Sequence, residues 1–198
     1  MNYKYLVIGL MLASLSVAAN ANVITFDDAI TTDSSGFSTQ GYNFDVLTNH
    51  YHLESTTTRY GTNSATTSLI IDDFAGDNSL SVSSIAGTNF DLSSFDIISA
   101  GTSFGSTTVS IVGALAGGGT LSYTYNDSDL NNFETVNLGW SNLTSVTFNG
   151  FGNTGSGENF FRLDNLNVAA NSVPEPASLL LLGLGLAGIG FTKKKKSS

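Results

Sequence analysis

The chain of 198 residues contains no cysteine, and its two prolines, Pro174 and Pro176, both lie near the C-terminal end. The absence of cysteine excludes disulfide bonds, cysteine catalysis and a lipid-modified N-terminal cysteine. A chain of this length buries enough apolar surface to fold without such cross-links. Before Pro174 no stretch shows a sustained helical period, so long amphipathic helices are not expected.

Positive charge is also scarce. Between residues 22 and 172 there are 15 acidic side chains, no lysine and only two cations, Arg59 and Arg162, so this body has a net charge of −13. A surface with so few cations cannot neutralise many phosphates, and nucleic-acid binding is therefore excluded as a function. An acidic surface outside the cell fits solubility in salt, or calcium binding.

The first 21 residues have the pattern of a secretory signal peptide. Lys4 precedes an apolar stretch from Tyr5 to Leu15, and Ala19-Asn20-Ala21 gives a small-x-small end. Such a segment directs export by the Sec machinery through the inner membrane and is then removed. We expect cleavage after Ala21, with Asn22 as the first mature residue.

The C-terminal tail, residues 173–198, combines an apolar run with a basic end. Residues 177–191 are uncharged, and Lys193, Lys194, Lys195 and Lys196 follow. As a helix the run rises ~22 Å, short for a hydrocarbon core of ~30 Å. A buried core helix is the alternative, but this run lacks the polar stripe of one. We expect a short transmembrane helix with its lysines in the cytoplasm and the body outside.

The tripeptide ahead of this run completes a recognisable pattern. Val173-Pro174-Glu175-Pro176, the Leu/Gly/Ala span and the lysines together resemble the PEP-CTERM sorting signal of Gram-negative bacteria. The resemblance implies recognition through Pro174, Glu175 and Pro176 by an exosortase, a membrane peptidase that processes the protein near that motif. It also implies transient anchoring in the inner membrane, then the cell surface or an extracellular matrix containing polysaccharide.

Within the body, residues 22–172, short apolar runs alternate with clusters of Gly, Asn, Asp and Ser, which is typical of strands. The expected fold is all-β, an antiparallel β-sandwich of jelly-roll type. The expected strands are Val23–Phe26, Tyr42–Leu47, Ser68–Ile71, Ser79–Ile85, Phe95–Ser99, Thr107–Val112, Thr120–Tyr125, Glu134–Leu138, Ser145–Phe148 and Phe160–Val168.

Two hairpins and one loop are expected between these strands. Ala116–Gly119 holds three consecutive glycines, which readily take the positive φ that tight hairpins need. Asp73–Asn78, with Gly76, is the second expected hairpin. The Ser/Thr-rich piece from Ser55 to Thr67 has little apolar content, so we expect an exposed loop there.

The second half of the body resembles jelly-roll sandwiches of the carbohydrate-binding-module kind. The residues that carry the resemblance are Phe90–Ile97, Val109–Val112, Thr135–Phe148 and Phe161–Val168, with Ile24–Asp28 in the first half. It implies that the first and last strands lie together, and that an acidic residue from each can hold a structural calcium ion.

The residue pattern of the closing strand also supports a calcium site. Phe161 and Leu163 are out of phase with Leu166 and Val168, and a bulge at Asp164-Asn165 would return all four to the core. The bulge would turn Asp164 toward a cation shared with Asp27 or Asp28, so these three residues are the candidate Ca²⁺ ligands. In the alternative, Asp164 and Asn165 only mark a strand bend. Two other groups, His50 with His52 and Asp72, Asp73 and Asp77, are weaker candidates.

Three functions remain open from the sequence. The first is a non-catalytic surface or matrix protein associated with exopolysaccharide, and the second is a carbohydrate-binding module with a defined glycan site. Sugars stack on exposed aromatic rings, for which the candidates are Trp140, Tyr51, Tyr60 and Tyr125, although Trp140 is expected to fill the core. The third, a secreted hydrolase, lacks a G-x-S-x-G turn and an assignable carboxylate pair, so we expect no catalytic residues.

Overall fold

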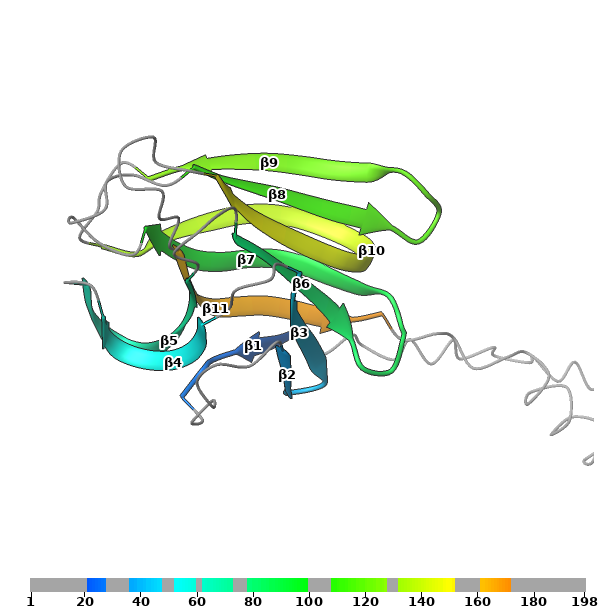
Figure 1. The fold of residues 1–198 in the computed structure, drawn as a ribbon. Coiled ribbons are helices and arrows are strands. Elements are labelled where there is room, and N and C mark those ends of the chain that lie inside the picture. The colour runs from blue at the N-terminus through cyan, green and yellow to red at the C-terminus, as the bar shows by residue number, and fades with distance from the viewer. Residues whose placement is uncertain are drawn as a thin grey trace, which may run out of the picture. The chain divides into compact units, whose positions relative to one another are not determined.

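The computed structural model describes residues 21–27, 36–47, 52–59, 62–72, 78–99, 108–127, 132–151 and 161–171 (Figure 1). The described residues lie within one compact unit, Ala19–Asn171. The expected signal peptide, sorting motif and apolar run lie outside the described residues. Across the ranges given above, no helix is long and apolar enough to cross a membrane.

The described part of the body consists of strands whose pairings are all antiparallel, which confirms the all-β fold predicted from the sequence. In chain order the strands are β1 (Ala21–Ile24), β2 (Gly36–Thr39), β3 (Tyr42–Val46), β4 (His52–Arg59), β5 (Thr62–Asp72), β6 (Asn78–Ser84), β7 (Phe90–Ser99), β8 (Thr108–Leu115), β9 (Thr120–Asn126), β10 (Glu134–Phe151) and β11 (Phe161–Ala170).

The long strand β10 joins the two layers of the sandwich. Its first half pairs with β7, and its second half pairs with β6 on one side and β8 on the other. One layer therefore runs β2-β3-β6-β10-β8-β9, and the other runs β10-β7-β11-β5-β4 with β1 on the second half of β11 (Figure 1). Because β10 is shared, the hydrogen-bonded ladder is continuous from one layer to the other.

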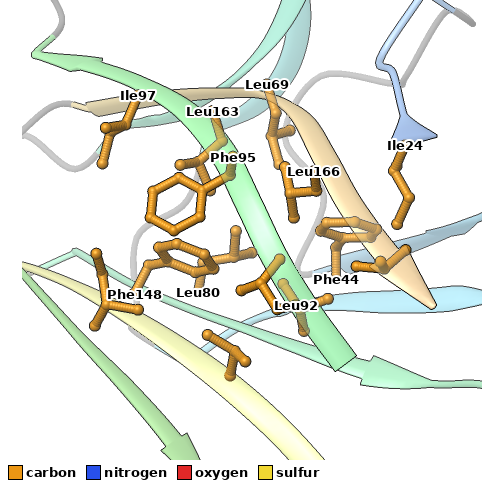
Figure 2. Close-up of a cluster of buried hydrophobic side chains, with 14 of the residues drawn as sticks. Ile24, Phe44, Leu69, Leu80, Leu92, Phe95, Ile97, Phe148, Leu163 and Leu166 are labelled. Atoms are coloured by element: carbon orange, nitrogen blue, oxygen red, sulfur yellow. The ribbon is translucent and has the colours of Figure 1, made fainter. Parts of the chain in front are cut away.

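The core lies between these layers and is filled from alternate positions of the strands. In β8, for example, Val109, Ile111 and Gly113 are buried while the residues between them are less so. Phe95 of β7 meets Phe148 of β10 edge to face, with ring centroids 5.1 Å apart (Figure 2). Such contacts bury apolar area and fix the spacing of the two layers.

The closing strand β11 carries the predicted bulge. Its register with β7 shifts between Asp164 and Asn167, and Asn165 has a left-handed φ of 49°. The shift places Phe161, Leu163, Leu166 and Val168 all in the core, as the out-of-phase pattern predicted. β1 pairs with the end of β11, so the first and last strands of the body lie side by side.

Three predictions about connections are wrong. Ser55–Thr67 is not a loop, because most of it lies in β4 and β5, which pair with each other and suit β-branched threonine. Asp73–Asn78 does not close a hairpin, since β5 pairs with β4 and β11 while β6 pairs with β3 and β10. Glu134–Leu138 and Ser145–Phe148 are parts of the single strand β10. The Ala116–Gly119 hairpin is confirmed between β8 and β9.

Candidate functional site

Trp140 lies between two irregularities of β10. The register of β10 with β7 shifts between Asn137 and Trp140 and again between Trp140 and Leu143. The backbone takes left-handed conformations on both sides of the indole, with φ of 61° at Gly139 and 60° at Asn142. Bulges re-aim side chains and often lie beside functional sites. The double irregularity therefore sets the direction of this one side chain independently of the regular ladder.

The indole of Trp140 crosses to the other layer and lies against Gly113 of β8. A Cβ atom built on Gly113 would be 2.8 Å from Trp140 Cε3, 3.0 Å from Cζ3 and 2.8 Å from Leu143 Cδ2. Only glycine fits beneath the ring without displacing something. Trp140 is half-buried and packs against the edge of the core, so part of the ring stays accessible.

Strand β9 continues this surface toward the edge of the sheet. Leu121 is opposite Gly113, and Tyr123 is opposite Ile111. Opposite residues project to the same face, so both side chains lie on the core-facing side of β9. That side is incompletely covered, because Leu121 is half-buried and Tyr123 is 42% exposed. We call Trp140, Gly113, Leu121 and Tyr123 the Trp140 surface.

Asn142 ties the bulge beside Trp140 to its surroundings. Its backbone N–H donates to Oδ1 of Asp91 at 2.8 Å, and its Oδ1 accepts from Nδ2 of Asn89 at 3.0 Å. Its carbonyl accepts from the N–H of Ala116 in the β8–β9 hairpin at 3.0 Å. Because these bonds reach both layers, the backbone at Trp140 is fixed relative to β7 and β9.

A half-buried indole held by its neighbours, with a tyrosine on the adjacent strand β9, offers a surface suited to stacking and apolar contact. The C–H faces of sugar rings suit such a surface. Trp140 was expected in the core, and the structure places it at the core's edge with one part accessible. Tyr125 is buried and offers no stacking face, while Tyr51 and Tyr60 lie outside the described residues.

The sequence analysis missed Tyr123 and Gly113. The alternation Leu121-x-Tyr123-x-Tyr125 indicates that the three side chains share a face of β9. It does not indicate which of the three the core covers, and the structure buries Tyr125 but leaves Tyr123 exposed. Gly113 carries no sequence signal for its place under the indole, since that contact joins residues 27 positions apart.

The predicted calcium ligand Asp164 lies on β11 beside the buried Arg162. Both side chains are on the side of β11 opposite Phe161 and Leu163, because the bulge follows Asp164 and leaves the alternation before it intact. Arg162 Nε donates to Ser68 Oγ at 2.8 Å, and its guanidinium carbon lies 5.9 Å from the centre of the Phe133 ring.

The carboxylate of Asp164 serves the bulge itself. Its Oδ1 accepts from the backbone N–H of Asn165 at 2.8 Å, and Asn165 Nδ2 donates to Asp96 Oδ2 at 2.9 Å. Asp96 Oδ1 also accepts from Thr135 Oγ1 at 2.6 Å. These bonds hold the left-handed turn at Asn165 across three strands, so Asp164 has a local structural role.

The other predicted calcium ligands are less closely defined. Asp27 follows β1, which pairs with β11, and its side chain is exposed, while Asp28 lies outside the described residues. Among described side chains no group of three or more His, Cys, Asp or Glu residues is arranged to hold a metal. A Ca²⁺ site at Asp27, Asp28 and Asp164 therefore stays a prediction. His50, Asp73 and Asp77 also lie outside the described residues.

Tyr125 presents a buried polar group at the end of β9. Among the described residues its hydroxyl makes no hydrogen bond of regular geometry, although the carboxylates of Asp127 and Glu134 are near enough for weak hydrogen bonds to it. Burial, and then the negative charges of Asp127 and Glu134, raise the pKa of this phenol far above its ordinary value of 10.0. Tyr125 is therefore neutral at all moderate pH values.

Comparison with solved structures gives similarities of low sequence identity. A family 29 carbohydrate-binding module is 17% identical, covers 80% of this chain and 95% of its own, and has a TM-score of 0.46. An exo-β-agarase is 12% identical, covers 75% of this chain and 26% of its own, and has a TM-score of 0.45. An arabinose-bound α-L-arabinofuranosidase is 9% identical, covers 77% of this chain and 27% of its own, and has a TM-score of 0.49. The chain thus spans about a quarter of the two enzymes. No curated protein sequence matches it.

A family profile matches the C-terminal tail. It covers residues 172–195, including Pro174, Glu175, Pro176 and the first lysines, and it describes the PEP-CTERM protein-sorting motif. The match confirms the resemblance found in the sequence. The chain therefore carries a PEP-CTERM sorting motif behind an antiparallel β-sandwich body.

Proposed function

We propose that this protein is a substrate of an exosortase and works as a non-catalytic component of the cell surface or extracellular matrix of a Gram-negative bacterium. The PEP-CTERM motif at residues 172–195 is the observation that carries the proposal. The Sec machinery exports the chain, the apolar run 177–191 anchors it transiently in the inner membrane, and the exosortase processes it near Pro174–Pro176.

The sandwich supports a binding or structural role for the body. Asp96 and Asp164, two carboxylates within it, are engaged in hydrogen bonds that hold the β11 bulge. A glycosidase needs two carboxyl groups facing a cleft, ~5 to 10 Å apart, and Asp96 and Asp164, which hold the backbone in this way, do not form such a pair. Association with exopolysaccharide fits an exported domain of this kind.

Two variants test the sorting. In Glu175→Ala, and in a chain lacking Lys193–Lys196, we expect unprocessed protein to accumulate in the inner-membrane fraction. Glu54→Ala removes one carboxylate from the body instead and serves as the matched control, with normal processing expected. Release of the Glu175→Ala variant at the wild-type rate and length would contradict the proposal.

A second function, glycan binding by the body, is favoured by the Trp140 surface. The indole is held between two bulges, over a residue that must be glycine, and it remains partly accessible. The net charge of −13 over residues 22–172 opposes uronate or sulfate groups, which carry the same sign. The proposed ligand is therefore a neutral polysaccharide that stacks on Trp140 and Tyr123.

Trp140 is the chain's only tryptophan, so fluorescence excited beyond the absorption of the seven tyrosines reports on this surface alone. We expect neutral glycans from an array to shift the emission of Trp140. The affinity for them should be at least tenfold weaker in Trp140→Ala, measured by calorimetry, and in Tyr123→Ala, which is a loss of about 1.4 kcal/mol or more of binding free energy. Ile85→Ala, which truncates an exposed side chain elsewhere, is the control. Wild-type affinity in both aromatic variants would exclude the Trp140 surface as the glycan site.

A further inference from the structure

Strand β9 is a sheet edge that lacks the usual features that prevent pairing with another chain. Within the described part of the chain it pairs with β8 alone, through seven consecutive residue pairs without a register shift. Its sequence, TLSYTYN, has no charge, proline or glycine. Natural edge strands are commonly short, charged, bulged or interrupted by proline, because an open row of N–H and C=O groups can recruit another strand.

The other edge strands in the described part of the sheet differ from β9. β1 and β2 have only four residues each, and β4 carries Glu54 and Arg59 and has a register shift against β5. Among the described edges, therefore, β9 combines length, regularity and neutrality. Neutrality matters in a body of net charge −13, where most surfaces of two copies repel each other.

The free backbone groups of β9 follow from its ladder with β8. Leu115 N–H donates to Gly119 O across the hairpin, and antiparallel ladders alternate between hydrogen-bonded and non-hydrogen-bonded pairs. Leu121, Tyr123 and Tyr125 therefore bond to β8, while the backbone groups of the residues between them point away from the sheet. The residues with outward groups are Thr120, Ser122, Thr124 and Asn126, and all four are exposed.

We propose that β9 pairs with the β9 strand of a second copy of this chain, antiparallel and centred on Tyr123, to give a two-fold symmetric dimer with a continuous sheet. In this register Ser122 faces Thr124 of the other copy and Thr120 faces Asn126. Every outward N–H and C=O then has a partner, and a shift by two residues leaves some of them without one. A second copy fits because its β9 has the same length, spacing and neutrality.

The arrangement also places the two Tyr123 side chains next to each other. At the two-fold axis the two Tyr123 residues form a non-hydrogen-bonded pair, whose Cα atoms lie ~4.5 Å apart with their side chains adjacent. Aromatic pairs at such positions stabilise sheets. Because the axis is perpendicular to the sheet, both Trp140 surfaces lie on the same side of the dimer, so one polysaccharide chain can engage both.

The experiment uses the full chain in mild detergent, and the absence of native cysteine makes single-cysteine variants specific. Under mild oxidation Tyr123→Cys is expected to form a disulfide-linked dimer, because the Cα separation at the axis suits a disulfide. Thr120→Cys is the control on the same edge, since its two copies lie about 20 Å apart in this register. Equal cross-linking of the two variants, or none at Tyr123→Cys, would overturn the proposal.

Thr124→Pro tests the same dimer by removing part of the pairing between the two β9 strands. The Thr124 N–H points away from β8, so proline removes a donor of the outer edge and keeps the inner ladder. Sedimentation velocity should give a dimer for the wild type and a monomer for Thr124→Pro and Thr124→Lys, each with wild-type circular dichroism. Ser141→Lys, exposed on β10, should remain a dimer. A monomeric wild type, or a Thr124→Lys dimer, would refute the pairing whatever the outcome for glycan binding.

Discussion

The indole of Trp140 lies against Gly113, with Cε3 only 2.8 Å from the place where a Cβ atom would be. This contact joins the two layers of the sandwich at the point where β10 passes from one to the other. Leu143 Cδ2 approaches the same position to 2.8 Å, so a side chain at residue 113 meets neighbours on two sides. The accessible position of the indole therefore depends on glycine at 113.

Gly113→Ala should move the indole and destabilise the body. Overpacking of a filled site costs about 1 to 3 kcal/mol, and relief by displacement of Trp140 would change its fluorescence emission. Gly117→Ala is the matched control, because nothing lies within 4 Å of a Cβ there. Urea unfolding followed by fluorescence measures both effects. Unchanged stability and emission in Gly113→Ala would show that the contact is not restrictive.

Tyr125 should govern part of the stability at alkaline pH. Its folded-state pKa is raised above the ordinary 10.0, so its proton is bound more tightly in the folded than in the unfolded state. This contribution is complete below about pH 10 and is lost as the pH rises above it, because the unfolded state then ionises first. Tyr125→Phe should therefore lose less stability above pH 10 than the wild type.

The same variant has an expected effect at neutral pH. Because the buried Tyr125 hydroxyl makes no hydrogen bond of regular geometry to the described residues, its removal should leave stability unchanged or raise it by about 1 kcal/mol. Tyr42, whose pKa is raised by burial and then by Asp91, contributes equally to wild type and variant. Tyr123→Phe, at an exposed position, is the control. Identical alkaline curves for Tyr125→Phe and wild type would contradict this assignment.

The calcium prediction is tested by thermal melting of residues 22–173 with EDTA and with millimolar Ca²⁺. An ion that binds only the folded state stabilises it by about 2.7 kcal/mol at ~100 times its Kd, which raises the melting midpoint by several degrees. Asp164→Ala should abolish the shift if Asp164 is a ligand together with Asp27 or Asp28. Coincident curves in the two buffers would rule out the calcium site and leave Asp164 with its structural role at the bulge, where it binds the N–H of Asn165.

The β11 bulge could be predicted from sequence because the phase change between Leu163 and Leu166 is local. The Ala116–Gly119 hairpin and the sorting motif could be predicted for the same reason, because the residues that define each of them are contiguous in the sequence. Trp140 is different, because its exposure depends on a contact with Gly113 across the sandwich. The β4–β5 hairpin was missed since Ser and Thr are common both in loops and in half-buried strands, and only pairing distinguishes the two.

Burial of Arg162 was also beyond the sequence. An isolated arginine in an acidic body reads as a surface charge, yet its side chain is fully buried with its Nε on Ser68 and its guanidinium beside Phe133. These partners come from β5 and from the segment before β10, and no spacing along the chain brings them together.

Intact mass spectrometry of the mature protein, recovered from the cell surface and the medium, tests the central claim most directly. We expect a chain that begins at Asn22, within a residue or two, and ends near Pro174–Pro176. In a host that lacks the exosortase we expect a chain that retains Lys193–Lys196 and stays in the inner membrane. Recovery of surface protein with an intact residue 173–198 tail, or the same mature mass with and without the exosortase, would contradict it.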